Sequence, residues 1–339
     1  MQLTVDGKTV EAKKGQSLRE LVCGLGLDRE QLSQRPLAAR IAGEVFTLNY
    51  IPLRDKDGEG DRPSMRRAMA ASGGNIRLLR IRDSAGRDVY VRTGQFVVFL
   101  ALRQLWPEAV STMDCTLGSS AFISVTGAKD FSVSRLKAQV EQIVAQDIPL
   151  LRHRAKKEEA IARFAAEGQG DKARLLQWRS LEYCSEYSYG DYTDNFYGEM
   201  APSTGYLSVW DILPADGGFL FVYPDELEPD RPAKLSPMPQ FFSVFTEGER
   251  WCRLMNCENV ADLNELTASG KIRELIRVNE ALHEKRFSQV ADMVCSRGAK
   301  AVLLAGPSSS GKTTSAHRLA TQLRVYGKKP ILMSLDDYY

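Results

Sequence analysis

The chain opens with hydrophobic and polar positions that alternate with the period of two that β-strands require. The turn residues Asp6-Gly7 and Gly43-Glu44 interrupt two of these stretches, which predicts two β-hairpins. A capping-box sequence from Ser17 to Glu20 marks the start of a short helix. Together these elements predict a small β-grasp module. The predicted elements are strands at 1–5, 8–12, 38–41, 45–48 and 75–82, a helix from Ser17 to near Gly24, and a surface helix at 62–71.

Helical spacing of the apolar residues dominates the middle of the chain. A strand is predicted at 88–92 and an apolar helix at 95–105, and amphipathic helices follow at 132–146, 156–165 and 171–178. The stretch Tyr183–Tyr197 is unusually aromatic, so it forms either a pocket where a base stacks or the packed core at a sheet edge. Core packing is the favoured interpretation. A proline- and acid-rich segment at 224–239 marks a boundary or a long surface loop, and helices at 260–264 and 272–294 form a connector.

A phosphate-binding pattern lies near the end of the printed sequence. Residues 301–305 are apolar and predict a buried parallel strand, and residues 314–326 predict a helix. Between them, Gly306 to Thr313 matches G-x-x-x-x-G-K-[ST]. This strand–loop–helix context predicts that the loop binds the phosphates of a nucleotide. The predicted binding residues are Gly306, Pro307, Ser308, Ser309, Ser310, Gly311, Lys312, Thr313 and Thr314.

Each residue type in this loop has a chemical role. Glycines at 306 and 311 let the backbone turn tightly and approach a phosphate. The N–H groups of residues 308–312 point at the β-phosphate from the start of the helix. Lys312 is expected to reach the β- and γ-phosphates, and the Thr313 hydroxyl is expected to bind Mg²⁺. The predicted cofactors are therefore ATP and Mg²⁺.

A second predicted strand, at 331–335, leads into Asp336-Asp337-Tyr338-Tyr339. This ending and the phosphate loop resemble the uridine kinase and phosphoribulokinase group. The resemblance implies that Asp336 is a general base and, with Lys312, a catalytic residue, while Asp337 is more simply the cap of a turn. The implied reaction is transfer of the ATP γ-phosphate to the 5′-hydroxyl of a nucleoside such as uridine.

The front of the chain resembles a different group. The hairpin–helix pattern is similar to the TGS module of threonyl-tRNA synthetases and some regulatory GTPases, and residues 194–206 resemble a stretch of the synthetase editing domain. That domain carries metal-ligand-type side chains in two i,i+4 pairs. Carried over by position, the pairs fall on Arg92 and Phe96 and on Phe196 and Met200. None of these is a usable ligand for catalytic Zn²⁺, so we predict no zinc site.

These observations combine into an α+β front half, a helical connector and the start of an α/β P-loop kinase domain. The expected domains are a TGS-like module (1–84), an editing-like domain without metal ligands (85–240), the connector (241–297) and an incomplete kinase-like part (298–339). Because a doubly wound domain needs roughly 150 residues, we expect the chain to be a fragment, or a truncated product, that is inactive alone.

Composition narrows the alternatives. The net charge is +2, so bulk electrostatics give no reason to expect a nucleic-acid or membrane partner. No apolar run reaches the roughly 18 residues that span a bilayer. The six cysteines lack any C-x-x-C pattern, which is typical of reduced thiols in a cytoplasmic protein. RNA remains a second partner, through the TGS-like module, and no pattern indicates an oligomeric state. Two functions from other classes stay open: a nucleotide-responsive RNA-binding regulator and, less favoured, an aminoacyl-tRNA editing hydrolase.

Overall fold

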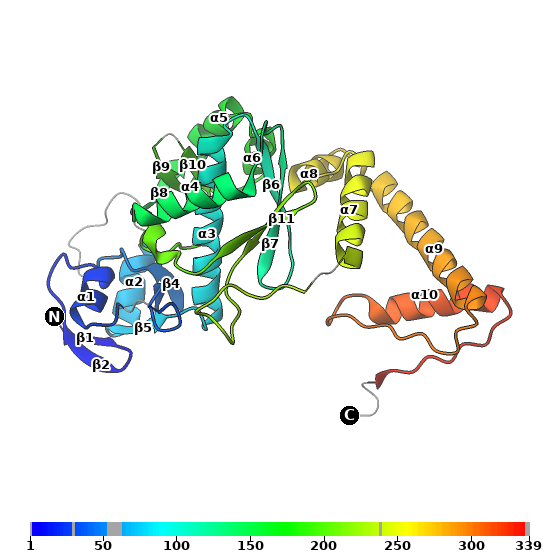
Figure 1. Ribbon diagram of the computed structural model, residues 1–339, viewed down its shortest axis with the longest axis horizontal. Coiled ribbons are helices and arrows are strands. Elements are labelled where there is room, and N and C mark those ends of the chain that lie inside the picture. The colour runs from blue at the N-terminus through cyan, green and yellow to red at the C-terminus, as the bar shows by residue number, and fades with distance from the viewer. Residues whose placement is uncertain (1, 29–30, 53–62, 191, 237–238, 336–339) are drawn as a thin grey trace. The chain divides into compact units, whose positions relative to one another are not determined.

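The computed structural model of the chain describes residues 2–28, 31–52, 63–190, 192–236 and 239–335 (Figure 1). The chain forms two compact units, Met1–Phe245 and Thr246–Tyr339. Every strand found in the described residues belongs to the first unit. The two units are therefore described one at a time.

A five-stranded mixed sheet forms the first module of unit 1. Its strand order is β2-β1-β5-β3-β4, in which β1 and β5 are parallel and the other neighbours are antiparallel. Positive φ angles at Asp6-Gly7 and Ala42-Gly43 close the two hairpins, as a tight β-turn requires. Both predicted hairpins are confirmed. The elements are β1 (Gln2–Val5), β2 (Lys8–Glu11), α1 (Leu18–Gly24), β3 (Ala38–Ile41), β4 (Glu44–Thr47), α2 (Pro63–Ala71) and β5 (Asn75–Leu79).

Helix α1 begins at the predicted capping box. The Ser17 side chain accepts a hydrogen bond from the Glu20 N–H at 3.2 Å, and the Glu20 carboxylate accepts one from the Ser17 N–H at 2.7 Å. Two of the backbone N–H groups at the start of the helix thus have partners. Leu18, Leu21 and Val22 on this helix are buried in the core of the module.

The 22-residue helix α3 (Ser84–Leu105) organises the rest of unit 1 (Figure 1). Buried residues lie around most of its circumference. At Gly94 the neighbours come so close that an added Cβ would lie 2.4 Å from Cζ of Phe221. The predicted strand at 88–92 is wrong, because these residues are part of α3. A helix covered on several sides carries apolar residues at many spacings, so its local pattern can imitate a strand.

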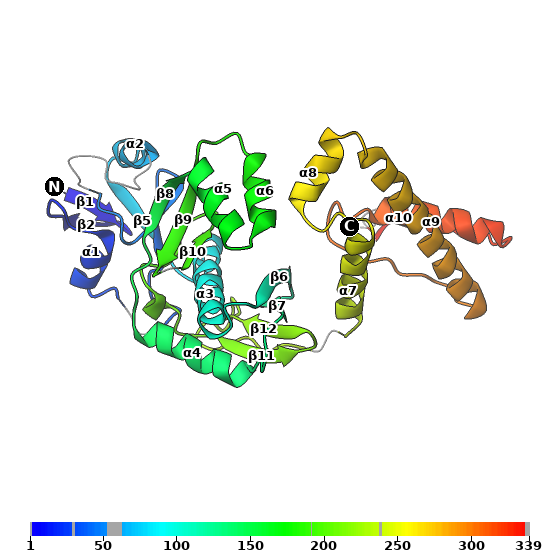
Figure 2. The same cartoon turned by 90° about the horizontal axis from the view of Figure 1, so that it is seen from above.

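Two antiparallel sheets and three further helices surround α3. The sheet orders are β11-β12-β7-β6 and β10-β9-β8, and helices α5 and α6 lie side by side next to the second sheet (Figures 1 and 2). The predicted helices at 132–146, 156–165 and 171–178 are confirmed, and the unit is of the α+β class. The elements are β6 (Val110–Thr116), β7 (Ser120–Thr126), α4 (Val133–Ala145), β8 (Arg152–Lys156), α5 (Lys157–Ala166), α6 (Gly170–Gln177), β9 (Tyr183–Tyr189), β10 (Tyr192–Asn195), the 3-10 turn η1 (Thr204–Tyr206), β11 (Asp211–Ala215) and β12 (Gly218–Val222).

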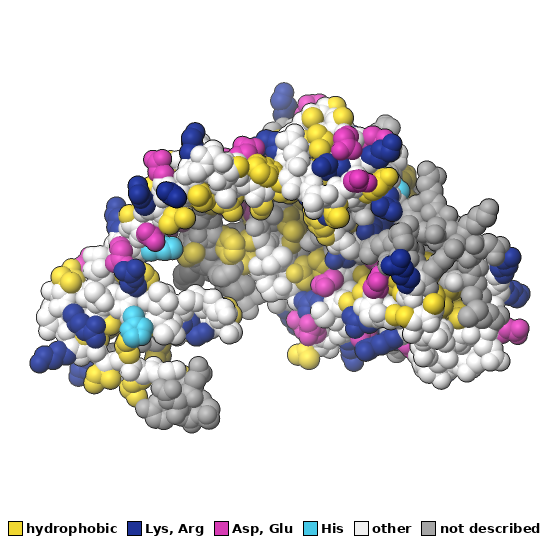
Figure 3. Space-filling model, turned by 180° about the vertical axis from the view of Figure 1, so that it is seen from behind, with side chains coloured by type: hydrophobic (Ala, Val, Ile, Leu, Met, Phe, Trp, Pro, Cys, Tyr) yellow, Lys and Arg dark blue, Asp and Glu magenta, His cyan; other side chains and the backbone are white. Residues whose placement is uncertain are grey.

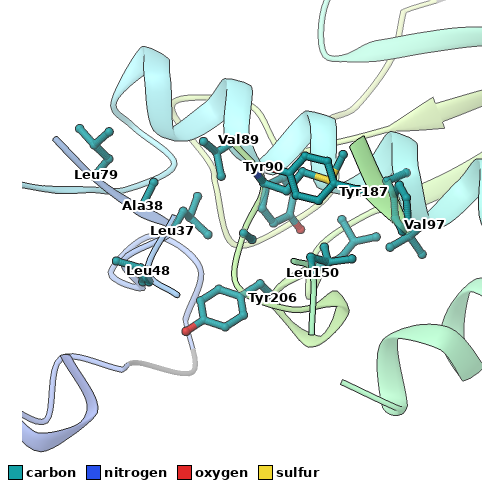
Figure 4. Close-up of a cluster of buried hydrophobic side chains, with 14 of the residues drawn as sticks. Leu37, Ala38, Leu48, Leu79, Val89, Tyr90, Val97, Leu150, Tyr187 and Tyr206 are labelled. Carbon is teal, nitrogen blue, oxygen red and sulfur yellow. Dashed lines mark hydrogen bonds between the residues drawn. The ribbon is translucent and has the colours of Figure 1, made fainter. Parts of the chain in front are cut away.

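The larger hydrophobic core of unit 1 includes both the first module and the residues around α3. Leu37 and Leu79 of the first module belong to the same cluster of buried side chains as Val89 of α3 and Leu150 and Tyr206 beyond it (Figure 4). A smaller second cluster lies between α5, α6 and the neighbouring sheet. It contains Ala155, Ala160, Phe164, Ala173, Leu176 and Cys184. The expected domain boundary at 84/85 crosses the larger core and stays a prediction.

Unit 2 is helical in its described part. It contains most of α7 (Pro239–Leu254), then α8 (Val260–Ala268), α9 (Ile272–Ser296) and α10 (Lys312–Val325). The predicted helices at 272–294 and 314–326 are confirmed by α9 and α10. The predicted strands at 301–305 and 331–335 are wrong, because neither segment is a strand and Leu303 and Ile331 are 93% and 86% exposed. A buried parallel strand requires paired neighbours, and no strand found in the described residues of this unit supplies one.

The surface gives two further results. On the face shown in Figure 3, basic and acidic side chains are interspersed, in keeping with the net charge of +2. Among the described residues, none of the helices combines the length and the apolar composition that crossing a membrane requires.

Candidate functional site

The four positions matched to the synthetase ligand pairs lie together in the structure. Arg92 and Phe96 are one turn apart on α3, and Phe196 and Met200 lie in the segment that follows β10. The ring centroids of Phe96 and Phe196 are 5.9 Å apart. The Arg92 guanidinium donates a hydrogen bond to the backbone carbonyl of Glu199. We call these four positions the filled site.

Side chains occupy the interior of the filled site. Phe96 and Met200 are fully buried. The Phe96 ring also contacts Tyr187 and Tyr192, with ring centroids 6.4 Å and 5.4 Å away. In the described part of the chain, no three His, Cys, Asp or Glu side chains converge as a metal site would require. The Arg, Phe and Met side chains at these four positions do not suit a metal ion that activates water.

A buried ion pair lies beside the filled site. Glu199, whose side chain is 3% exposed, pairs with Arg152 at 2.5 Å between Oε1 and Nη1. The Tyr187 hydroxyl lies 3.4 Å from the other carboxylate oxygen. Burial raises the pKa of Glu199 above its ordinary value, and the charge of Arg152 opposes this shift. The pair therefore holds a charged carboxylate in a place that disfavours charge.

A serine, a histidine and an acid also meet on the sheet β10-β9-β8. Nε2 of His153 lies 3.4 Å from the Ser188 hydroxyl and 3.4 Å from Oε2 of the buried Glu186. A hydrolytic triad requires the serine and the acid to bond to different ring nitrogens. Here both groups lie near Nε2, the Oε2 of Glu186 makes no hydrogen bond within the described residues, and its Oε1 pairs with Arg163. These side chains therefore form no proton relay of the triad type.

Exposed aromatic and basic side chains gather at one end of this sheet. Tyr183 begins β9 and is 40% exposed, and Tyr197 follows β10 and is 62% exposed. The Arg154 guanidinium lies over the Tyr183 ring at 4.4 Å, and that of Arg179 over the Tyr197 ring at 5.0 Å. Trp178, at the end of α6, is 46% exposed. We call these five residues the tyrosine–arginine end.

The tyrosine–arginine end lies next to the filled site, because Tyr197 and Phe196 are neighbours in the chain. Tyr197 is exposed, whereas the neighbouring Phe196 packs inward on Phe96. Arg179 Nη1 donates to the Tyr197 hydroxyl at 3.3 Å, and Lys157 Nζ donates to the Arg179 carbonyl at 3.2 Å. The tyrosine–arginine end is thus an ordered surface next to the filled site.

The nine predicted phosphate-binding residues lie at the start of α10. Gly311, at φ 81°, caps the helix in the left-handed conformation that suits glycine. An added Cβ at Gly306 would lie 2.7 Å from the Ser310 hydroxyl oxygen, so this turn is also tight. Lys312 Nζ donates to the Pro307 carbonyl at 2.8 Å and therefore reaches back over the loop. Asp336, the predicted general base, lies outside the described residues.

No protein-family model matches the chain, but several curated proteins do. The threonine–tRNA ligase of Symbiobacterium thermophilum is 25% identical over 218 residues, which cover 63% of this chain and 30% of that protein. The ligase of Acetivibrio thermocellus is 26% identical over 220 residues (63% and 31%). The ligase of Methylococcus capsulatus is 26% identical over 192 residues (56% and 27%). The chain spans less than a third of the length of these relatives.

The prediction of an ATP-dependent nucleoside kinase is wrong. The relatives are tRNA ligases over up to 63% of the chain, and they support neither the uridine kinase nor the phosphoribulokinase resemblance. The kinase prediction rested on one loop motif, on the ending Asp336-Asp337-Tyr338-Tyr339, which lies outside the described residues, and on two strands that the structure does not form. The threonyl-tRNA synthetase resemblance of the front of the chain is supported.

The sequence indicated only part of the tyrosine–arginine end. It singled out the aromatic stretch that contains Tyr183 and Tyr197, and it offered stacking as the less favoured interpretation. The structure divides that stretch, because Tyr187 is buried in the core whereas Tyr183 and Tyr197 are exposed. Arg154 and Arg179 were missed, since only the folded sheet brings them over these rings.

Proposed function

We propose that this protein binds RNA at the tyrosine–arginine end and that a single-stranded end of tRNA is its partner there. The observation that carries the proposal is the guanidinium that lies over the ring of each exposed tyrosine, Arg154 over Tyr183 and Arg179 over Tyr197. Proteins bind unpaired bases by stacking them on aromatic rings and on arginine planes. The names of the relatives support tRNA as the partner.

Local side chains, rather than overall charge, provide the affinity in this proposal. The net charge of +2 gives little general attraction to a polyanion. Arg154 and Arg179 each place a positive charge beside an aromatic face, and Trp178 adds a third exposed ring. A binding surface of this kind favours unpaired nucleotides, because paired bases cannot present their faces to the rings.

Binding in this proposal is not followed by metal-dependent hydrolysis. The synthetase positions for metal-ligand-type side chains hold Arg92, Phe96, Phe196 and Met200. The Arg92 guanidinium donates a hydrogen bond to the Glu199 carbonyl, and Phe96 and Met200 are buried. The filled site, next to the tyrosine–arginine end, is therefore packed with side chains. In this proposal an ester bond placed there would meet no activated water.

The second part of the proposal concerns residues 306–314, which we infer bind the phosphates of a nucleotide, with ATP and Mg²⁺ as the candidates. The loop offers the N–H groups at the start of the 14-residue helix α10, the charge of Lys312 and tight turns at both glycines. The Thr313 hydroxyl would be one ligand of Mg²⁺, which would neutralise phosphate charge. Together the two sites describe a nucleotide-responsive RNA-binding regulator.

The RNA proposal is tested by fluorescence anisotropy with two forms of one tRNA. One form keeps its single-stranded 3′ end, and the other lacks those unpaired nucleotides. The full chain should bind the intact form more tightly. Tyr197→Ala should weaken that binding by about 1–3 kcal/mol, or roughly 5- to 160-fold, because one stacking face is lost.

Matched controls separate stacking from general loss of structure. Tyr326→Ala removes an exposed tyrosine from the second unit and should leave RNA binding unchanged. Equal affinity for both tRNA forms, or unchanged affinity in Tyr197→Ala, would contradict the proposal. Hydrolysis of mischarged tRNA above background would instead show that the filled site has chemistry that its side chains do not suggest.

A further inference from the structure

The outer face of the five-stranded sheet carries two arginines directly opposite each other. Arg40 of β3 is the register partner of Arg77 of β5. Thr4 of β1 is likewise opposite Asn75 of β5. These side chains share the face that points away from Leu3, Ile76 and Leu78, which are buried. Like charges directly opposite each other destabilise a sheet unless something neutralises them.

Within the part of the chain that the structure describes, Arg77 has an acidic partner and Arg40 has none. Nη2 of Arg77 pairs with Asp83 at 2.7 Å. Among the described residues, Arg40 has no hydrogen-bond or ion-pair partner, and its Nε is buried. A buried guanidinium N–H without an acceptor costs free energy. The buried Nε–H of Arg40 can therefore still donate a hydrogen bond to an acceptor from outside the described part of the chain.

A hollow of about 680 Å³ opens over these two arginines. Thr4, Ser72 and Asn75 add neutral polar groups to its lining, and the hairpin turns at Gly7 and Gly43 form its rim. No heavy atom lies within 4 Å of an added Cβ at either glycine, so the rim is open.

The carboxylate of Asp6, which belongs to the described lining, already has hydrogen-bond partners. Its Oδ1 accepts from the Leu78 N–H at 2.8 Å, and its Oδ2 accepts from Arg80 at 3.1 Å. Counting described residues, the lining thus contains two basic side chains, Arg40 and Arg77, and one acidic side chain, and the Nε of Arg40 is an unused donor.

We propose that this hollow is an oxyanion site that takes a phosphate group between Arg40 and Arg77. A guanidinium matches the geometry of a phosphate with two parallel hydrogen bonds, and a shared anion would remove the repulsion between the paired strands. The phosphate has two candidate sources, a free phosphate or the backbone of an RNA. The site is separate from residues 306–314, and the proposal does not rest on the proposed RNA function.

The test observes the two arginines directly in the full chain. NMR of Nε-labelled arginine resolves their side chains, with the signals assigned by Arg40→Lys and Arg77→Lys. Inorganic phosphate, added at constant ionic strength, should move both signals along one saturable curve. The signal of Arg87, which pairs with Glu226, should stay fixed. A shift that came from phosphate bound at the loop of α10 would persist in Arg40→Gln.

Arg40→Gln gives a second readout that a purely structural role would not produce. Without phosphate, this variant should be at least as stable as the parent, because one of two opposed charges is gone. It should lose the phosphate-dependent shift of the Arg77 signal. Movement with an RNA oligonucleotide but not with phosphate assigns the site to an RNA backbone, and movement with phosphate assigns it to a free phosphate. No saturable movement with either probe, or a persistent Arg77 shift in Arg40→Gln, would overturn the proposal.

Discussion

Removal of Arg152 should leave the buried carboxylate of Glu199 without its ion-pair partner. In Arg152→Met the Glu199 side chain, 3% exposed, loses its ion-pair partner at 2.5 Å. Breaking a buried pair from one side costs about 3–5 kcal/mol of unfolding free energy. Arg92 also lies near Glu199 and attracts its charge, so we expect a value near the lower limit, about 3 kcal/mol.

This loss should depend on pH in a defined direction. Burial raises the folded-state pKa of Glu199 above its ordinary 4.5, and loss of Arg152 raises it further. A carboxyl with a raised folded-state pKa ionises first in the unfolded state. Its penalty is therefore absent below the unfolded-state pKa, grows as the pH rises toward the folded-state pKa, and is complete above it. Arg152→Met should be most destabilised at pH 7 and much less so near pH 4.

Denaturant unfolding of the chain and three variants measures these effects. Glu199→Gln should cost less, about 1 kcal/mol, because its amide oxygen still accepts from Arg152. The double variant Arg152→Met/Glu199→Gln should be more stable than Arg152→Met at pH 7, since no buried charge remains. A pH-independent cost for Arg152→Met, or a double variant no better than it, would refute the assignment of a desolvated carboxylate.

Three further predictions concern other side chains. Tyr206 is fully buried, and the Arg35 guanidinium lies 3.8 Å from its ring centre. Tyr206→Ala should therefore lower the unfolding free energy by about 3–5 kcal/mol. Tyr206→Phe should change it by less than about 0.5 kcal/mol, because the lost hydroxyl has no hydrogen-bond partner among the described residues, and a large loss would show an overlooked bond. Lys312→Ala should weaken nucleotide binding in calorimetry, and unchanged affinity would remove the loop of α10 from the phosphate site. Elemental analysis of the purified chain should find no stoichiometric zinc, whereas one tightly bound zinc per chain would reject the match of ligand positions to Arg92 and Phe96.

Local sequence rules predicted the elements whose structure depends on near neighbours. The capping box at Ser17 and the turns of the two hairpins require contacts only a few residues apart. The capping box and the Asp6-Gly7 turn formed as expected, and the second turn, predicted at Gly43-Glu44, lies one residue earlier at Ala42-Gly43. The strand expected at 88–92 failed because burial of α3 on several sides comes from distant segments, including Phe221. A local pattern contains no information about such neighbours.

The candidate sites also differ in how far each depends on contacts between distant segments. The match of Arg92 and Phe96 with Phe196 and Met200 came from a family resemblance, and the structure brings the two segments together. The stacking of Arg154 on Tyr183 depends on strand register, which the sequence does not display. The strand expected at 301–305 rested on its apolar composition, yet a strand also requires partners.

The core shared by the first module and α3 affects how the chain folds during synthesis. The Asn49 amide of the first module donates to the Pro202 carbonyl at 2.8 Å, across 153 residues of sequence. A ribosome that adds 5–20 residues per second needs roughly 8–30 s to make that intervening segment. The first module is therefore made long before the surface that covers Leu37 and Leu79. During that interval its apolar side chains are open to chaperones, and the nascent chain is most prone to aggregation.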